Sequence, residues 1–377
     1  MTDRILGKLR NDPAWFAVAV FAFIFLGLFL LWPLSTVLHY SFLDEEGAFT
    51  LEGYRTFFTD PDYTDSLKNT LILGFSVTAT SLLLGSSLAL VVSRCRFALA
   101  GAVSILPLVT LVVPDVVVAA AWILLIGRQG IITGLLSHFG IAMPSLYSWW
   151  GLIFTMTLNS YVYVFVIMLG AFKLMDRSLE EAGLGLGRPM PEVLSGITMP
   201  LMIPSLLSAA LVVFTHVIGN FGIPAILGAR IPVLSVKAYN EFVSEMGGNP
   251  LMQTTMASIL IAIGLLVLLA QKYLVERRQF QMESGRTPEK VRLTGGSRIA
   301  AGVFVAIVMI LSLCPAAVVI VTAFTKTTGP VLHYGEWTLE NVQYALFSAP
   351  EPLYNSLWLA SVATLAEIGR ASCRERV

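Results

Sequence analysis

Long apolar runs recur along this sequence and constrain its fold more than any other feature. They lie at residues 15–38, 70–92, 99–126, 148–172, 199–227, 252–271 and 299–324, and an eighth begins near Tyr354. A helix needs about 20 mostly apolar residues to cross the hydrocarbon core of a bilayer, and each run supplies roughly that length. Only 13% of the residues are charged, whereas soluble domains carry about 25%. The chain is therefore predicted to be an integral membrane protein.

The runs predict helices rather than strands. Only α-helices and closed β-barrels satisfy their backbone groups in lipid, and barrel strands would show about ten residues of alternating polarity. The first run is too long for a signal peptide and lacks an obvious small-residue cleavage site, so we expect a retained helix. The predicted fold class is an all-α integral membrane protein.

The distribution of Lys and Arg predicts the orientation. If the N-terminus is cytoplasmic, the loops on that side carry most of the basic residues, whereas the first outside loop is acidic. This arrangement places residues 177–200 on the cytoplasmic face. Net charge is zero and the three cysteines are widely separated, so we expect no nucleic-acid partner, no metal site and no cofactor.

An internal repeat is indicated after the longest inside loop. The first helix is followed by Pro33, by TLEGYRTFF from Thr50 and by Asn69-Thr70, and the seventh by Pro315, by TLENVQYALF from Thr338 and by Asn355-Ser356. Chance similarity between amphipathic loops is the alternative. We expect a true duplication, with two transport modules fused in one chain.

The second copy is expected to be incomplete. A charged string, EIGRASCRERV at residues 367–377, ends an apolar helix after about a dozen residues. These residues match, one for one, the translation of a sequencing adapter, and a genuine basic tail is the alternative. We therefore expect the native sequence to end near Ala366, and we expect the chain to lack transport activity by itself.

The segment 179–204, LEEAGLGLGRPMPEVLSGITMPLMIP, is polar and rich in Gly and Pro between two apolar runs. Residues 177–186 are predicted to form a short helix with Leu179, Ala182 and Leu186 on one stripe. Glu180 and Glu181 lie near its N-terminus, where the helix dipole favours negative charge. Gly187 is expected to end this helix, with a second short turn at 192–198 before Pro200 opens the next span.

This segment resembles the EAA loop of permease subunits from binding-protein-dependent ABC importers. The resemblance rests on the spacing E-A-x4-G-x9-I-x2-P, and the chain departs from the usual family pattern at Gly183, where alanine is common, and at Met199, where leucine is common. We expect Gly183 to loosen the first short helix. The residues that carry the motif are Glu181, Ala182, Gly187, Ile197 and Pro200.

The resemblance implies a function and partners. In that family the loop docks on an ATP-binding subunit at the cytoplasmic face, and an external binding protein delivers the substrate. It implies that Glu180, Glu181, Ala182, Gly183, Gly187, Ile197 and Pro200 form the coupling loop of a bacterial inner-membrane permease, surrounded by lipid. Within that family, a single chain with two permease copies resembles the ferric-iron type most closely. Phosphonate, thiamine and polyamine permeases are the alternatives.

The predicted organisation follows from these features. Residues 1–65 hold the first helix and an acidic periplasmic loop, and 66–272 form a permease domain that completes a six-helix module. Residues 273–298 form a cytoplasmic linker, 299–366 begin a second module, and 367–377 are the adapter translation.

Polar residues inside the spans are candidates for the translocation path, because such residues are costly in lipid. Asp115 follows Pro114, so it either caps a restarted helix or lines a water-filled gap. His216 and Asn220 are four residues apart and are expected on one helix face, and Asn159 lies in the fourth run. Helix–helix hydrogen bonding is the alternative for these residues.

Enzyme motifs are missing from the sequence. There is no HExxH, GxSxG or Walker lysine motif, so we expect a transporter that performs no bond chemistry. A proton-coupled secondary transporter that uses Asp115 and His216 as relay groups is the alternative from another class.

Overall fold

The computed structural model describes residues 13–44, 46–96, 100–243, 249–276, 295–328 and 331–374. The chain divides into two compact units, residues 1–312 and 313–377. Within the described residues, seven helical segments are long and apolar enough to cross a membrane: Phe16–Tyr40, Pro61–Arg94, Asp115–His138, Trp149–Leu174, Met190–Ile218, Pro250–Tyr273 and Gly295–Ala323. The all-α membrane fold class is confirmed, and each predicted run from the first to the seventh overlaps one of these segments.

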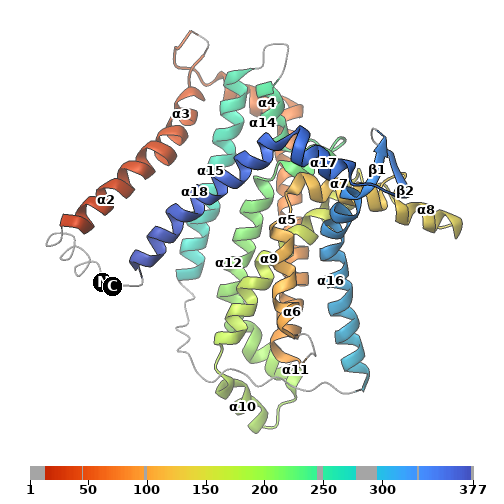
Figure 1. Cartoon of the computed structure of the whole chain (residues 1–377). Helices are drawn as coiled ribbons and strands as arrows, with labels where there is room; N and C mark the ends of the chain where they lie inside the picture. The colour runs from red at the N-terminus through yellow and green to blue at the C-terminus, as the bar shows by residue number, and fades with distance from the viewer. Residues whose placement is uncertain are drawn as a thin grey trace. The chain divides into compact units, whose positions relative to one another are not determined.

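The first unit is built around three long helices that lie side by side in Figure 1. These are α5 (Pro61–Arg94), α9 (Trp149–Leu174) and α12 (Met199–Ile218). The span that contains α9 is the most deeply buried of the seven, and Thr80 of α5 shares a 2.6 Å hydroxyl hydrogen bond with Thr157 of α9. Hydroxyl groups that bond across helices are a common device in membrane bundles. The helix α9 is therefore the core of this unit.

The other helices of the first unit surround or extend this core. They are α2 (Pro13–Leu26), η1 (Gly27–Leu31), α3 (Trp32–Tyr40), α4 (Glu52–Thr59), α6 (Ala100–Ile105), η2 (Leu106–Leu111), α7 (Asp115–Ile126), α8 (Ile131–His138), α10 (Arg177–Gly185), α11 (Met190–Val193), η3 (Leu194–Thr198), α13 (Gly222–Leu227), α14 (Leu234–Val243), α15 (Pro250–Glu276) and the first part of α16 (Gly295–Ala323).

Two predicted spans are interrupted, which corrects the prediction. The run at 99–126 divides into α6, the 3₁₀-helix η2 and α7, and its residue 99 lies outside the described residues. Pro107 lies in the 3₁₀ turn and Pro114 directly precedes α7, and each proline lacks the N–H that an unbroken helix requires. The run at 199–227 similarly breaks after Ile218, where Gly219, Asn220 and Phe221 separate α12 from α13.

The end of the first unit that lies away from α10 is closed by α4, α14 and one end of α15 (Figure 1). Phe57, Leu234, Met252 and Met256 form a buried cluster there. The Tyr54 hydroxyl is 2.8 Å from the Ser41 hydroxyl and 2.8 Å from the Ser258 hydroxyl. The TLE segment of the first copy is thus anchored between α3 and α15.

The second unit begins within α16 and continues through β1 (Thr325–Thr328), β2 (Val331–Trp337), α17 (Glu340–Gln343), η4 (Tyr344–Ser348) and α18 (Pro350–Arg374). The strands β1 and β2 form an antiparallel hairpin, which the sequence analysis did not predict. Helix α18 covers the predicted start of an eighth run but is not among the seven candidate spans. Most of the predicted linker, at 277–294, and residues 375–377 of the predicted adapter translation lie outside the described residues.

Local geometry around the two TLE segments is closely matched. In the first, Thr50 N–H donates to the Phe42 carbonyl at 2.8 Å and Thr50 Oγ1 accepts from Glu52 N–H at 3.1 Å. In the second, Thr338 N–H donates to the Phe324 carbonyl at 2.9 Å and Thr338 Oγ1 accepts from Glu340 N–H at 3.1 Å.

A backbone pairing precedes each TLE segment in the same register. Leu43 bridges Phe49 before the first segment, and Thr325 pairs with Trp337 before the second. Phe42 also follows Pro33 by the same number of residues as Phe324 follows Pro315.

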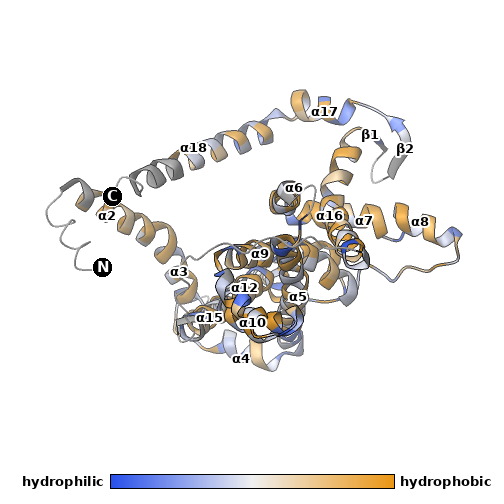
Figure 2. Cartoon of the chain, turned by 90° about the horizontal axis from the view of Figure 1, so that it is seen from below, coloured by the Kyte–Doolittle hydropathy of each residue, from blue (hydrophilic) through white to orange (hydrophobic). Residues whose placement is uncertain are grey.

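Large apolar side chains remain exposed along the outer faces of the spans. Helix α2 is an example, with Phe21 and Phe23 exposed to 66% and 76%. Figure 2 shows hydrophobic colouring along α2 and α15. Exposed apolar faces on helices of this length fit a hydrocarbon surrounding rather than water.

Candidate functional site

The predicted loop at 177–200 forms one short helix joined to the start of a long one. Helix α10 covers Arg177–Gly185, as predicted, and the Asp176 carboxylate accepts a 2.9 Å hydrogen bond from Ser178 N–H at its first turn. Gly187 ends the helix with φ of +79°, while Arg188 N–H donates to the Gly183 carbonyl. A glycine in the left-handed conformation with such a bond is a common helix ending.

The predicted second short turn is not a separate element, which corrects the prediction. Residues Met190–Ile218 form one helical segment through α11, η3 and α12. Met199 N–H reaches back to the Leu194 carbonyl in the π turn η3, and this wider turn lies directly before Pro200. Because a proline ring crowds the carbonyl four residues earlier, a π turn here relieves that crowding.

Helix α10 presents an apolar face to its surroundings. Leu179 and Leu184 are exposed to 44% and 43%, and Leu186 to 82%; Ala182 is also exposed. The predicted stripe of Leu179, Ala182 and Leu186 therefore points outward rather than onto the bundle. An exposed apolar patch on a polar loop is typical of a protein–protein contact.

Glu180 points the other way, although the sequence analysis grouped it with Glu181. It is 4% exposed, its two carboxylate oxygens accept from Arg94 at 2.7 and 2.5 Å, and Oε1 accepts from the Thr198 hydroxyl at 2.7 Å. Glu181 is exposed. Neither Arg94 nor Thr198 was among the residues predicted for this site.

Gly183 marks the contact between α10 and the long helix. A Cβ at this position would lie 2.9 Å from Ile197 Cδ1 and 3.0 Å from Val193 Cγ2. The two helical segments therefore approach more closely than a larger residue would allow. Among the predicted loop residues, Glu180, Gly183 and Ile197 hold α10 in place, whereas Glu181, Ala182, Gly187 and Pro200 are exposed.

Three of the four predicted path residues meet where the helices break. Asp115, at the first position of α7, accepts hydrogen bonds from Asn159 Nδ2 at 3.0 Å and from Asn220 Nδ2 at 2.6 Å. Asn220 Oδ1 also accepts from Ile223 N–H in the first turn of α13. The N-cap residue of α7 is Pro114, so Asp115 lies one residue inside the helix, and its two carboxylate oxygens bond to Asn159 and Asn220.

His216 does not join this cluster by a hydrogen bond. Its ring lies 4.9 Å from the Tyr163 ring, and its buried Nε2 has no hydrogen-bond partner among the described residues. Because α12 ends at Ile218, Asn220 is beyond the helix, and the predicted shared helical face for His216 and Asn220 is wrong.

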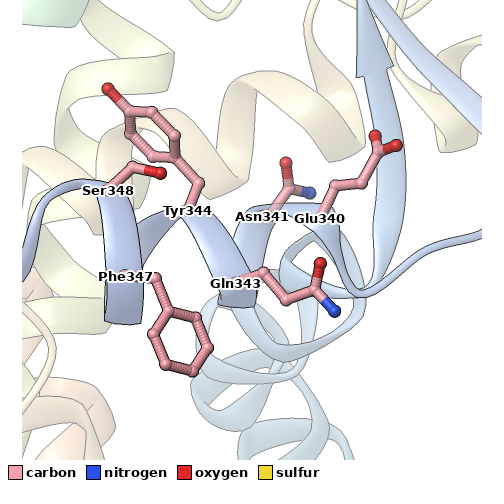
Figure 3. A pocket seen from close by; sticks show the side chains of 6 residues that line it. All are labelled: Glu340, Asn341, Gln343, Tyr344, Phe347 and Ser348. Atoms are coloured by element: carbon pink, nitrogen blue, oxygen red, sulfur yellow. The ribbon is translucent and has the colours of Figure 1, made fainter.

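A shallow groove on α17 and η4 offers no ligand site. Figure 3 shows its six lining side chains, which splay from one helical segment instead of converging: Glu340, Asn341, Gln343, Tyr344, Phe347 and Ser348. Asn341 Nδ2 donates to the Thr325 carbonyl at 2.9 Å, which is a structural role. In the part of the chain described, no three His, Cys, Asp or Glu side chains are grouped to hold a metal.

Comparison with known families decides the class of the protein. The family described as "Binding-protein-dependent transport system inner membrane component" matches residues 81–280, which is more than half of the chain and includes the whole α10 loop. The chain belongs to this permease family. This membership decides against the alternative of a proton-coupled secondary transporter.

Relatives of this permease include ferric and 2-aminoethylphosphonate transport permeases. A putative ferric transport system permease protein, FbpB 1 of Haemophilus influenzae, is 26% identical over 75% of this chain and 45% of its own length. A ferric transport system permease protein of Actinobacillus pleuropneumoniae is 29% identical over 59% of this chain and 32% of its own length. A putative 2-aminoethylphosphonate transport system permease protein of Salmonella typhimurium is 25% identical over 62% of this chain and 84% of its own length. The chain thus spans less than half the length of the two ferric relatives.

Solved structures support the fold of this permease. A bacterial ABC transporter that imports the acidic polysaccharide alginate has a chain that is 17% identical, with a TM-score of 0.58 over 74% of this chain and 100% of that one. The same transporter in complex with an alginate pentasaccharide-bound periplasmic protein gives a TM-score of 0.60 at 18% identity, over 75% of this chain and 100% of that one.

Proposed function

We propose that this permease couples ATP hydrolysis by a partner subunit to the uptake of a substrate, and that α10 is its coupling helix. The carrying observation is the two-sided geometry of α10. Its outer face exposes Leu179, Leu184 and Leu186, while its inner face is fixed to the bundle through Glu180. A helix with an apolar outer face and a rigid inner attachment can bind a partner subunit and transmit the displacement of that subunit to the membrane spans.

In this proposal α10 faces the cytoplasm and docks on the ATP-binding subunit. The excess of Lys and Arg on that side supports the orientation, and the N-terminus is then also cytoplasmic. A periplasmic binding protein delivers substrate to the opposite end. When the ATP-binding subunits close, α10 moves with them and the attached spans reorient between outward and inward access.

We propose that the chain carries one permease module and the beginning of a second. The matched hydrogen bonds at Thr50 and Thr338 support this duplication, as do the matched pairings before each TLE segment. The two loops share both the register and the bonds, which favours duplication over chance similarity. The greater length of the ferric relatives agrees with a two-module organisation.

Ferric iron is the substrate we propose, and 2-aminoethylphosphonate is the second candidate. Ferric permeases are among the relatives that cover the largest share of this chain, and the proposed duplication fits their length. The phosphonate permeases are similar in identity. Substrate choice in this proposal rests mainly with the binding protein.

The docking role is tested by a charge on the outer face of α10. Leu186→Glu should abolish co-purification of the ATP-binding subunit, because a carboxylate would be buried in an apolar contact without a partner. Leu51→Glu is the matched control, since Leu51 is 56% exposed and directly precedes α4, which lies at the other end of the first unit (Figure 1). This change should leave co-purification intact. Retention of the ATP-binding subunit by Leu186→Glu at the wild-type level would refute the docking role.

A further inference from the structure

A buried ion pair joins α10 to the end of α5, 86 positions away in the sequence. The Arg94 and Glu180 side chains are only 9% and 6% exposed, and the guanidinium binds both carboxylate oxygens. Such a two-point contact fixes direction as well as distance, because the planar guanidinium matches the planar carboxylate. Helix α10 is therefore held in one orientation on α5.

The same carboxylate also reaches the long helix that follows the loop. Thr198 donates its hydroxyl proton to Glu180 Oε1 at 2.7 Å, and it is fully buried at the junction of η3 and α12. One side chain of α10 thus bonds to α5 and to the turn η3 that leads into α12. Gly183 of α10 also contacts Val193 and Ile197, and because this contact is apolar and non-directional, it would by itself permit sliding.

Stability alone gives a weak reason for this arrangement. A buried ion pair usually contributes little more than well-packed apolar residues of the same volume, because both charges lose their hydration. What it adds is a unique geometry. A helix that transmits displacement needs one fixed orientation relative to the helices that it moves, and the ion pair provides that orientation.

We propose that Glu180 is a positioning residue that makes α10, α5 and α12 move as one body, with Arg94 and Thr198 as its two attachment points. This inference rests on the proposed coupling function. Without this tie, the outer face of α10 would still dock on the ATP-binding subunit, but its displacement would not reach α5.

The test measures the distance between α10 and α5 in two nucleotide states. Nitroxide labels are placed at Ser178 of α10 and Ser87 of α5, both of which are exposed, in the assembled transporter without nucleotide and with trapped ADP·vanadate. In the wild type we expect one narrow distance distribution that is the same in both states. In Glu180→Gln we expect a distribution at least twice as broad, and a shift on trapping, because α10 moves without α5.

Three further variants distinguish a positioning role from a loss of structure. Thr198→Ser keeps the hydroxyl and should behave as the wild type. Thr198→Val removes one of the two attachments of Glu180 but keeps the Arg94 pair, so it should broaden the distribution less than Glu180→Gln does. Asp65→Asn is the matched control, because Asp65 pairs with Lys68 on the same helix α5, with both side chains more than half exposed, and an exposed pair fixes little. A general loss of structure would broaden both nucleotide states equally; only a broken tie makes the distance depend on nucleotide.

Glu180→Gln alone leaves the Arg94 charge buried without its partner, which could prevent insertion into the membrane. The double variant Arg94→Gln, Glu180→Gln leaves no buried charge unpaired and replaces the single variant in that case. It should also broaden the distribution. Wild-type distances in Glu180→Gln, or in the double variant, would overturn the proposal. If the wild type does not bind an ATP-binding subunit, the proposed function fails instead. The positioning role is then tested in the labelled chain alone, where Glu180→Gln should broaden the distance distribution and Asp65→Asn should not.

Discussion

At the scale of single residues, polar side chains at helix breaks and helix ends hold the bundle together. Asp115 receives two amide donors from separate segments, and Glu180 receives a guanidinium and a hydroxyl. In each case a carboxylate in a mostly apolar protein is satisfied by groups distant in sequence, and Glu180 is buried whereas Asp115 is half-buried. Removing either partner of the Arg94–Glu180 pair alone should cost about 3–5 kcal/mol.

Asn220→Ala should lower the free energy of unfolding by about 1.5–3 kcal/mol, because Asp115 loses a charge-assisted hydrogen bond and α13 loses the bond to Ile223 N–H. Thermal unfolding in detergent measures this loss. Asn249→Ala is the control, since Asn249 also accepts from a backbone N–H, that of Met252, but no carboxylate depends on it. Equal losses in the two variants would show that the Asp115 contact adds nothing.

At the scale of elements, the sequence predicts where helices exist better than where they break. Hydropathy marks 99–126 and 199–227 as continuous runs, yet both divide at residues that hydropathy does not distinguish, Pro114 and Gly219. The bounds of α10 could be predicted because its signals are local: Asp176 at the start and Gly187 at the end.

The inward orientation of Glu180 could not be predicted in this way. Its partner Arg94 belongs to a different helix, and the two adjacent glutamates look alike in sequence. The candidate loop was thus found from sequence, whereas its inner attachment required the packing of α5, α10 and α12.

The contact between α10 and the long helix gives a prediction at this scale. Gly183→Ile should push α10 away from Val193 and Ile197, because even a Cβ there lies within 3.0 Å of both side chains, and co-purification of the ATP-binding subunit should fall at least ten-fold. Gly183→Ala should retain binding, since the flexible end of Ile197 can shift by a few tenths of an ångström. Gly170→Ile serves as the control, because nothing lies within 4 Å of a Cβ at that position of α9.

Failure of Gly183→Ile to weaken binding would mean that the placement of α10 does not depend on this close contact. The helix would then be positioned by Glu180 alone.

At the scale of the whole molecule, the chain is a permease, and we propose that it supplies a path and a coupling element. Its membrane spans, its membership in a binding-protein-dependent family and the two-sided helix α10 all agree with this division of work. The proposed duplication adds that a complete transporter has two coupling loops, one for each module.

ATP-dependent uptake into proteoliposomes tests the central claim most directly. The vesicles contain the permease with both modules complete, together with its ATP-binding subunit. Substrate is presented on the binding protein, in parallel as radioactive ferric iron and as radioactive 2-aminoethylphosphonate. We expect accumulation of ferric iron that requires ATP on the side of the membrane where the ATP-binding subunit lies. This accumulation should be lost in Leu186→Glu. Accumulation driven by a proton gradient in the absence of ATP would contradict the account, and ATP-driven accumulation of the phosphonate alone would replace the proposed substrate.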